Sequence, residues 1–412
     1  MLRSLCVPLL ALTLLLLPAF AQGESSPAAE AMNNLGLRLL TVTDTASDQN
    51  LILSPLSIQS ALAMTSTGAA GATLTEMHTV LGIGSGEAAF AGALNAIISE
   101  LNQAARSSHA ESGEPLEWSL ANRLFVEETF SLQASFQRNL ESLYGAGLRT
   151  DSFRTAPEAA RLRINAWVAE TTQARLRNLI PAGGVDRQTT IVLVNGLFLK
   201  APWADPFQEH RTTEAPFRLE QGGTTPTRLM RRVGTLRFVQ SPRYTAVALP
   251  YRHGGLQAIF LLPAEGTRVS ALLKEISAAD LTSLAEAPLR PVDLALPRFT
   301  EAGETIDLAS PLEQLGMRQA FDIPPGSADF SRMSAGTDRT HISAVFHQTF
   351  LAVDERGTEA AAATAVTLLR GAPPGPGLPP VPFTADRPFL FGIQHQPSGA
   401  CLFLGVVRRP RT

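Results

Sequence analysis

The feature that most constrains the fold is a predominantly apolar run at residues 190–199, TIVLVNGLFL, in the second half of the chain. Its β-branched and large apolar side chains fall on both alternating faces of an extended segment. A strand that is apolar on both faces is buried from two sides, so this run predicts the central strand of a covered sheet. Similar composition predicts further strands at residues 235–239, 246–249, 256–262, 292–296, 346–353, 389–393 and 402–407.

The first half of the chain is predicted to be mainly helical. Apolar spacing favours a helix at residues 28–43, and Ser54-Pro55 is typical of a capped helix start. Helical segments are expected from there to about residue 105, and then at 132–144, 156–179, 269–273 and 277–285, with a strand at 116–126. Helices early and strands late, without a repeat or linker, predict one α+β domain over residues 22–412.

Residues 1–21 are predicted to be a secretory signal peptide. Arg3 precedes an apolar run at residues 9–17, and Ala19-Phe20-Ala21 is a small-x-small cleavage site. A membrane anchor is the alternative, although the run is short for a spanning helix and no other run reaches spanning length. We therefore expect export to the extracellular or periplasmic space and no membrane partner.

The amino-acid composition indicates the type of source genome and excludes some classes of binding partner. The 412 residues carry a formal net charge of −3, which predicts no nucleic-acid partner. Lys200 and Lys274 are the only lysines among 34 basic residues, which indicates a GC-rich genome such as that of a bacterium. Without residues 1–21 a single cysteine, Cys401, is left, so no intrachain disulfide is expected. Cys401 is predicted to be a small core residue, with a reactive thiol as the alternative.

No enzyme motif is found. Residues 82–86, GIGSG, have the wrong spacing for a nucleophile elbow or a dinucleotide site. The chain also lacks a phosphate-binding Gly-Lys-Ser/Thr motif and His-Glu-x-x-His, and one cysteine cannot build a thiolate zinc site. We expect no catalytic residues, metal or cofactor. A Ser/His/Asp set assembled only by folding, as in a hydrolase, stays open.

Residues 355–387 have no hydrophobic periodicity. The first part, GTEAAAATA at residues 357–365, contains mainly small side chains, and the Pro-rich part at 373–380 cannot form a central strand. A loop of this length in an ordered domain is functional or disordered. An Ala-rich linker or a short helix is the ordinary alternative, because Ala favours helix.

The first part of this loop is suited to entering a sheet. In an extended conformation one face carries only small or β-branched, uncharged side chains: Thr358, Ala360, Ala362, Thr364 and Val366. Small side chains fit between packed neighbours, where extra volume costs about 1–3 kcal/mol. Glu359 lies on the other face, where it can stay in water.

Residues 355–364, ERGTEAAAAT, resemble the proximal hinge of inhibitory serpins. Other segments resemble the family in the same order over nearly the whole mature chain, at residues 50–71, 194–207, 249–251, 296–299, 328–331 and 386–389. The resemblance implies the serpin fold, with helices packed on three β-sheets and an exposed reactive-centre loop at about residues 355–387. It assigns the hinge to Glu355, Gly357, Thr358, Glu359, Ala360, Ala361, Ala362 and Ala363.

The resemblance also implies the activity. A serine protease would cut the loop, the loop would insert into the central sheet, and the acyl-enzyme would be trapped in a covalent complex without turnover. The family implies no cofactor, and we expect a monomer. A non-inhibitory serpin acting as a carrier or chaperone is the alternative, although the small, uncharged hinge face argues against it.

The side chain before the cut selects the protease. Arg370-Gly371 is the favoured bond, because arginine suits the acidic pocket of trypsin-like enzymes. The usual family spacing from the hinge points instead to Gly371-Ala372, which suits elastase-like enzymes. Leu369-Arg370, suited to chymotrypsin-like enzymes, is the third possibility.

Further roles follow from the resemblance alone. Ser54, Ser57, Asn195 and His347 resemble the shutter beneath the opening sheet, where a buried His–Asn hydrogen bond holds the closed state. Trp203 resembles the aromatic residue of the breach, where the loop first enters. Ordinary core roles are the alternatives for His347 and Trp203. Residues 86–106 resemble the cofactor-binding helix but contain one Arg and no Lys, so no heparin site is expected.

Overall fold

The computed structural model describes residues 26–44, 48–84, 86–144, 148–334, 340–358 and 378–411. The signal-peptide prediction at residues 1–21 falls outside this part of the chain. The helices are α1 (Pro27–Thr43), α2 (Pro55–Ser66), α3 (Gly71–Leu81), α4 (Glu87–Ser108), α5 (Ala134–Tyr144), α6 (Pro157–Thr171), α7 (Val269–Glu275), α8 (Ala278–Ser283) and α9 (Ala309–Gln314), with short 3-10 turns η1 (Glu209–Arg211) and η2 (Gln319–Phe321).

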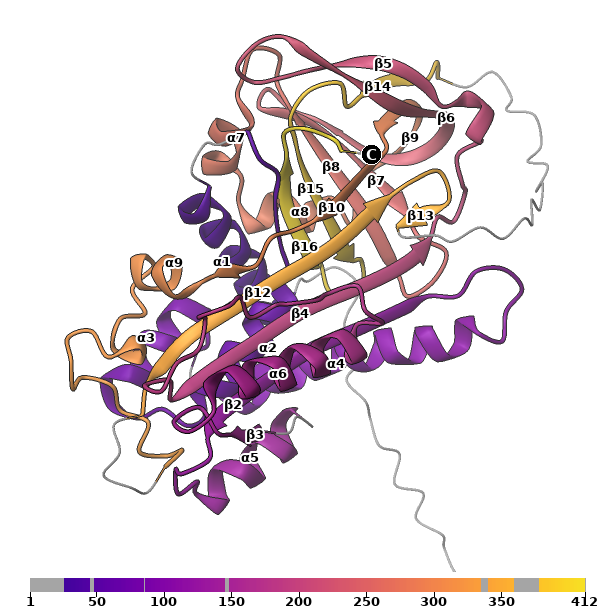
Figure 1. The fold of residues 1–412 in the computed structure, drawn as a ribbon. Helices are drawn as coiled ribbons and strands as arrows, with labels where there is room; N and C mark the ends of the chain where they lie inside the picture. The colour runs from indigo at the N-terminus through magenta and orange to yellow at the C-terminus, as the bar shows by residue number, and fades with distance from the viewer. Residues whose placement is uncertain are drawn as a thin grey trace, which may run out of the picture.

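One sheet has seven strands, and its centre is formed by two long strands that are far apart in sequence. Its strand order is β10 (Phe299–Ala302), β12 (Ile342–Val353), β13 (Gly357–Thr358), β4 (Ile191–Pro202), β2 (Glu117–Glu127) and β3 (Leu148–Asp151), and β11 (Ile306–Asp307) pairs with β12. β4 and β12 pair directly and in parallel from Ile191 and Ile342 as far as Leu197 and Thr349. Beyond that point β13 lies between them (Figure 1).

The other described strands form a nine-stranded network: β1 (Leu51–Leu53), β16 (Ala400–Val407), β15 (Phe389–His395), β8 (Leu256–Pro263), β7 (Tyr244–Pro250), β6 (Thr224–Gln240), β9 (Leu289–Pro297) and β14 (Val381–Thr384) in order, with β5 (Thr213–Arg218) on β6. The 17-residue β6 pairs with β5 from Thr224 to Leu229, with β9 from Leu229 to Arg237 and with β7 from Arg237 to Gln240. Strand β6 therefore connects two sheets. For this reason the three β-sheets expected from the family resemblance are seen as two hydrogen-bonded networks. The predicted α+β serpin fold is confirmed.

The predicted burial of β4 on both faces is confirmed, since eleven of its twelve residues are buried. Val192 and Val194 point into a cluster with Ile164 and Val168 of α6. Leu193 and Leu197 point into the main core on the opposite side. The two faces of the seven-stranded sheet are thus packed against different layers.

Two helix boundaries test the sequence rules. α2 begins as predicted, with Pro55 in its first turn and the Ser54 side chain accepting a hydrogen bond from the Ser57 amide. The helix expected at 156–179 is wrong at its end, because α6 ends at Thr171. The Thr172 hydroxyl bonds to the Val168 carbonyl and accepts from the Leu176 amide, and the next residues take positive φ, which ends the helix.

Within the described residues, no helix is both long enough and apolar enough to span a bilayer.

Candidate functional site

The start of the predicted hinge is already seated in the seven-stranded sheet. Thr358 pairs with Val353 of β12 on one side and with Ala201 of β4 on the other, and its side chain is fully buried. Gly357 is packed so closely that a Cβ atom there would lie 2.1 Å from the Ala201 carbonyl oxygen. The position therefore requires glycine, because no larger residue fits without moving the backbone of β4.

An aromatic pair closes this end of the sheet. Trp203 stacks on Tyr251 with 4.4 Å between ring centroids and 12° between ring planes. The Trp203 indole N–H donates to the Asp354 carbonyl at 2.9 Å, and the Tyr251 hydroxyl lies 2.5 Å from the Thr358 hydroxyl. Burial raises the pKa of Tyr251, so its hydroxyl stays neutral. Trp203 thus lies beside the start of the predicted hinge, and its role in the breach stays a prediction from the family resemblance.

The pivot before the hinge is fixed by two neighbouring acidic residues. The buried Glu355 carboxylate accepts from the Thr212 hydroxyl at 2.8 Å and lies 3.7 Å from the Arg298 guanidinium. Asp354 Oδ1 accepts from the backbone amides of Arg356 and Gly357 at 2.8 and 3.2 Å, and burial raises the pKa of this carboxyl. These contacts form the tight turn that reverses the chain between β12 and β13.

His347 lies under the middle of the sheet and links three elements. The Ser54 amide at the start of α2 donates to His347 Nε2 at 3.1 Å, so the proton of the neutral ring is on Nδ1. Nδ1 then donates to Asn195 Oδ1 of β4 at 2.5 Å. Burial lowers the pKa of His347 to about 3, which keeps the ring neutral.

Ser57 extends this network to a residue that the sequence did not indicate. Its hydroxyl donates to Asn122 Oδ1 at 2.9 Å, and the Asn122 amide donates to the Ser57 carbonyl at 2.9 Å. Asn122 on β2 lies opposite Asn195 on β4. The four residues predicted for the shutter are therefore brought together, and Asn122 completes the group. Only the register of β2 on β4 identifies it.

Other residues at the hinge were also missed. Tyr251 belongs to the Leu-Pro-Tyr segment that carries part of the resemblance, but no role was inferred for it. Thr212 and Asp354 gave no signal because their partners are distant in sequence or are backbone groups. The remaining predicted hinge and scissile-bond residues lie outside the described residues: Glu359, Ala360, Ala361, Ala362, Ala363, Arg370, Gly371 and Ala372.

Comparison with known proteins identifies the class that this sheet defines. The family model described as serpin (serine protease inhibitor) matches residues 30–410. Horse leukocyte elastase inhibitor is 35% identical, with 88% of this chain and 93% of that protein covered, and human Serpin B9 is 34% identical, with 93% and 99% covered. Uncleaved ovalbumin superposes with a TM-score of 0.77 at 27% identity, covering 93% of this chain and 100% of that one.

The chain belongs to the serpin family. Thyroxine-binding globulin complexed with thyroxine is also similar in structure, with a TM-score of 0.78, 26% identity and coverage of 93% and 99%. Members such as the leukocyte elastase inhibitors are protease inhibitors and not catalytic enzymes, which confirms the expectation that this chain is no enzyme and supports protease inhibition.

The comparisons correct two predictions about origin and location. Secretion to the extracellular or periplasmic space is contradicted, because leukocyte elastase inhibitor and Serpins B9 and B6 are intracellular serpins that lack signal peptides. An apolar N-terminal run followed by small residues is therefore not sufficient to assign export here. A bacterial source is also unsupported, since these relatives come from mammals. Scarcity of lysine is therefore not sufficient to assign a bacterial source.

Proposed function

We propose that this serpin inhibits serine proteases by sacrificing its reactive-centre loop. The target protease cuts the loop, the part before the cut inserts between β4 and β12, and the acyl-enzyme is carried away in a covalent complex. The observation that supports this mechanism best is the seating of Gly357 and Thr358 between these two strands. The upper end of the sheet is thus already open by one hinge strand.

The strand register supports continued insertion. Thr358 is opposite Ala201 of β4 and Val353 of β12, and both pairings are antiparallel. If this antiparallel register continues, Thr364, six residues after Thr358, would pair with Asn195 on β4 and with His347 on β12. These residues lie six positions before Ala201 and Val353, respectively. These two residues are partners across β4 and β12 in the closed sheet. The hydroxyl of Thr364 can both donate and accept, so it can replace the hydrogen bond that insertion breaks.

The same register places small side chains where space is limited. Thr358 faces the core beside Ala201, so every second residue from Thr358 faces the core as well. Those positions hold Ala360, Ala362 and Val366, none of which brings a charge into the apolar layer. Insertion would add on the order of ten ladder hydrogen bonds, each contributing about 1 kcal/mol net. The cleaved form is therefore expected to be far more stable than the intact form.

We propose Arg370-Gly371 as the reactive bond and a trypsin-like protease as the target. The arginine side chain would enter an acidic specificity pocket. The leukocyte elastase inhibitors among the relatives favour the alternative bond Gly371-Ala372, because a small residue before the cut suits an elastase-like pocket. Both bonds lie beyond the residues that reach the shutter.

The test is incubation of the purified protein with trypsin and with leukocyte elastase, followed by denaturing electrophoresis. We expect an SDS-stable complex with trypsin and a released C-terminal fragment that begins at Gly371 by mass spectrometry. Arg370→Ala should abolish the trypsin complex. A complex with elastase alone, and a fragment that begins at Ala372, would transfer the assignment to the alternative bond.

A non-inhibitory serpin is the second candidate, and the structural likeness to thyroxine-binding globulin favours it. It predicts cleavage of the loop by either protease without any SDS-stable complex. That outcome would overturn the inhibitory proposal.

A further inference from the structure

A polar cavity lies away from β13 and the shutter, between α5, the start of α4 and the segment around Arg332. Its volume is about 320 Å³, at the lower end of the range of about 300–1,000 Å³ for small-molecule pockets. Its walls are formed by Thr67, Glu87, Gln133, Ser135, Phe136, Asn139, Leu143, Ser331 and Arg332. None of these residues takes part in the inhibitory mechanism proposed above.

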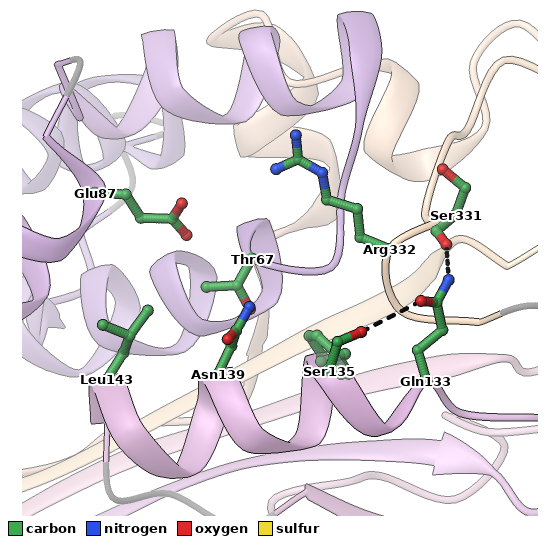
Figure 2. Close-up of a pocket in the computed structure, with 9 residues that line it drawn as sticks. Thr67, Glu87, Gln133, Ser135, Asn139, Leu143, Ser331 and Arg332 are labelled. Carbon is green, nitrogen blue, oxygen red and sulfur yellow. Dashed lines mark hydrogen bonds between the residues drawn. The ribbon is translucent and has the colours of Figure 1, made fainter.

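Two opposite charges face this cavity without forming an ion pair. Figure 2 shows the Glu87 carboxylate and the Arg332 guanidinium on one side of the hollow, with Gln133, Ser135 and Asn139 along the α5 side. Among the described residues, Glu87 Oε1 is buried and has no hydrogen-bond partner. An unsatisfied buried carboxylate oxygen is costly, so a ligand that donates a hydrogen bond there would be stabilised.

Within the described residues, two side chains near Glu87 also have unsatisfied polar atoms. Tyr144 Oη and His78 Nε2 are buried without a hydrogen-bond partner among the described residues. Burial, followed by the nearby Glu87 carboxylate, raises the pKa of Tyr144, so its hydroxyl remains a neutral donor. Neither Tyr144 nor His78 lines the cavity, but both lie close to Glu87, so the region around this carboxylate has polar groups that the described residues leave unsatisfied.

The charges select the class of ligand. A dianion such as phosphate would be repelled by Glu87, and a simple cation would be repelled by Arg332. Within the described part of the chain, no group of three His, Cys, Asp or Glu side chains is arranged to hold a metal ion. A small zwitterion satisfies both charges at once, because its ammonium can donate to Glu87 and its carboxylate can accept from Arg332. Phe136 and Leu143 supply an apolar wall for a side chain.

We propose that this cavity binds a free α-amino acid, with the ammonium at Glu87 and the carboxylate at Arg332. The amides of Gln133 and Asn139 and the hydroxyl of Ser135 line the α5 side and can hydrogen-bond to the ligand's polar groups. The Gln133 amide is already fixed by donation to the Ser331 carbonyl, and the Ser135 hydroxyl donates to Gln133 Oε1 at 3.3 Å. The site is therefore partly organised before any ligand enters.

Occupation of the cavity would tie together two walls that insertion separates. α5 follows β2, which pairs with β4, whereas residues 331–334 precede β12 in the chain. The Gln133 backbone N–H already donates to the Met333 carbonyl at 2.9 Å. A bound amino acid would add a link between these walls and slow the separation of β4 from β12. This consequence rests on the proposed inhibitory function, whereas the binding itself does not.

The test is calorimetric titration of the full chain with L-leucine, N-acetyl-L-leucine and L-leucinamide. We expect binding of L-leucine only, since each of the other two probes lacks one of the two charges. Glu87→Gln and Arg332→Gln should each raise the dissociation constant at least about tenfold, as loss of a charge-assisted hydrogen bond predicts. Glu141→Gln, on the exposed side of α5, should leave it unchanged.

Absence of heat with all three probes, or equal binding of all three, would overturn the proposal. So would an equal loss of binding in Glu141→Gln. The rate of SDS-stable complex formation with trypsin, with and without saturating L-leucine, is measured separately. Binding without an effect on that rate would overturn only the link to insertion, and a failure to inhibit trypsin would leave the calorimetric result standing.

Discussion

The imidazole of His347 on β12 and the amide of Asn195 on β4 form a buried hydrogen bond, with 2.5 Å between Nδ1 and Oδ1. The bond crosses the pair of strands that the proposed insertion separates. The Ser54 amide fixes the tautomer by donating to Nε2, so the same ring also holds the start of α2 against the sheet. Protonation of Nε2 would break that contact.

The stability of the intact protein should therefore depend on pH through His347. Burial lowers the pKa of His347 to about 3 in the folded state, against about 6.5 in the unfolded chain. Below pH 6.5 the unfolded chain binds a proton that the folded protein does not, so stability falls as the pH decreases from about 6.5 toward about 3. We expect this group to reduce the free energy of unfolding by about 2 kcal/mol between pH 7 and pH 5, measured by urea denaturation.

The control is His347→Gln, which removes the titrating group and should lose that part of the pH dependence. His395 contributes in the same window, because burial lowers its pKa to about 4, and it is present in both proteins. His109→Ala alters an exposed histidine and should keep the full slope. If the free energy of unfolding depends on pH equally in the wild type and in His347→Gln, then His347 is not held as a neutral, buried imidazole.

The residues assigned to the shutter lie together in the structure, whereas most contacts at the start of the hinge were not anticipated. Ser54, Ser57, Asn195 and His347 were assigned to the shutter from the family resemblance. The structure places them in one hydrogen-bonded group, and their role as a shutter stays a prediction. Asn122 could not be found in the same way, because its role depends on the register of β2 on β4, which no local pattern specifies.

Local rules succeeded where the sequence itself decides the conformation. Ser54 caps α2 through its own side chain, a contact within three residues. The end of α6 was missed because apolar spacing continues to Leu176, which is buried although the helix has ended. Burial of Leu176 is set by tertiary packing, so the periodicity was correct about the core and wrong about the helix.

Gly357→Ala should expel the hinge strand from the sheet. The added Cβ would lie 2.1 Å from the Ala201 carbonyl oxygen and 2.8 Å from the Pro202 Cα, and both are backbone atoms of β4 that cannot rotate away. We expect the free energy of unfolding to fall by about 1–3 kcal/mol, with faster limited proteolysis near residue 357. Gly84→Ala is the matched control, because a Cβ there meets nothing within 4 Å. Equal stability and proteolysis of the two variants would mean that β13 is not tightly seated.

Thr358→Glu should convert the protein from an inhibitor into a substrate. The Thr358 side chain is already buried in the sheet beside the Tyr251 hydroxyl. A carboxylate at this position would leave the sheet to keep its hydration, so insertion after cleavage would have to bury it. We expect the ratio of SDS-stable complex to cleaved protein to fall at least about tenfold with trypsin, since about 1.4 kcal/mol is enough for that change. Thr224→Glu, at an exposed position on β6, should form complex like the wild type. If Thr358→Glu forms the SDS-stable complex as well as the wild type does, inhibition does not require burial of residue 358 in the sheet.

Thr364→Val tests whether the inserted loop replaces the His347–Asn195 hydrogen bond with hydrogen bonds to the side chain of residue 364. In the intact protein the His347–Asn195 bond is present, so the substitution should leave the stability of the intact form unchanged. If the loop inserts after cleavage as we propose, the register that Thr358 begins would bring residue 364 between these two side chains. Valine fills nearly the same volume as threonine but cannot hydrogen-bond, so the His347 N–H and the Asn195 carbonyl would be left buried without partners. We expect the cleaved form to lose about 1–3 kcal/mol in guanidinium unfolding. Thr364→Ser keeps the hydroxyl and should retain most of that stability. If the cleaved forms of the two variants unfold alike, the inserted strand follows a different register from the one that Thr358 begins.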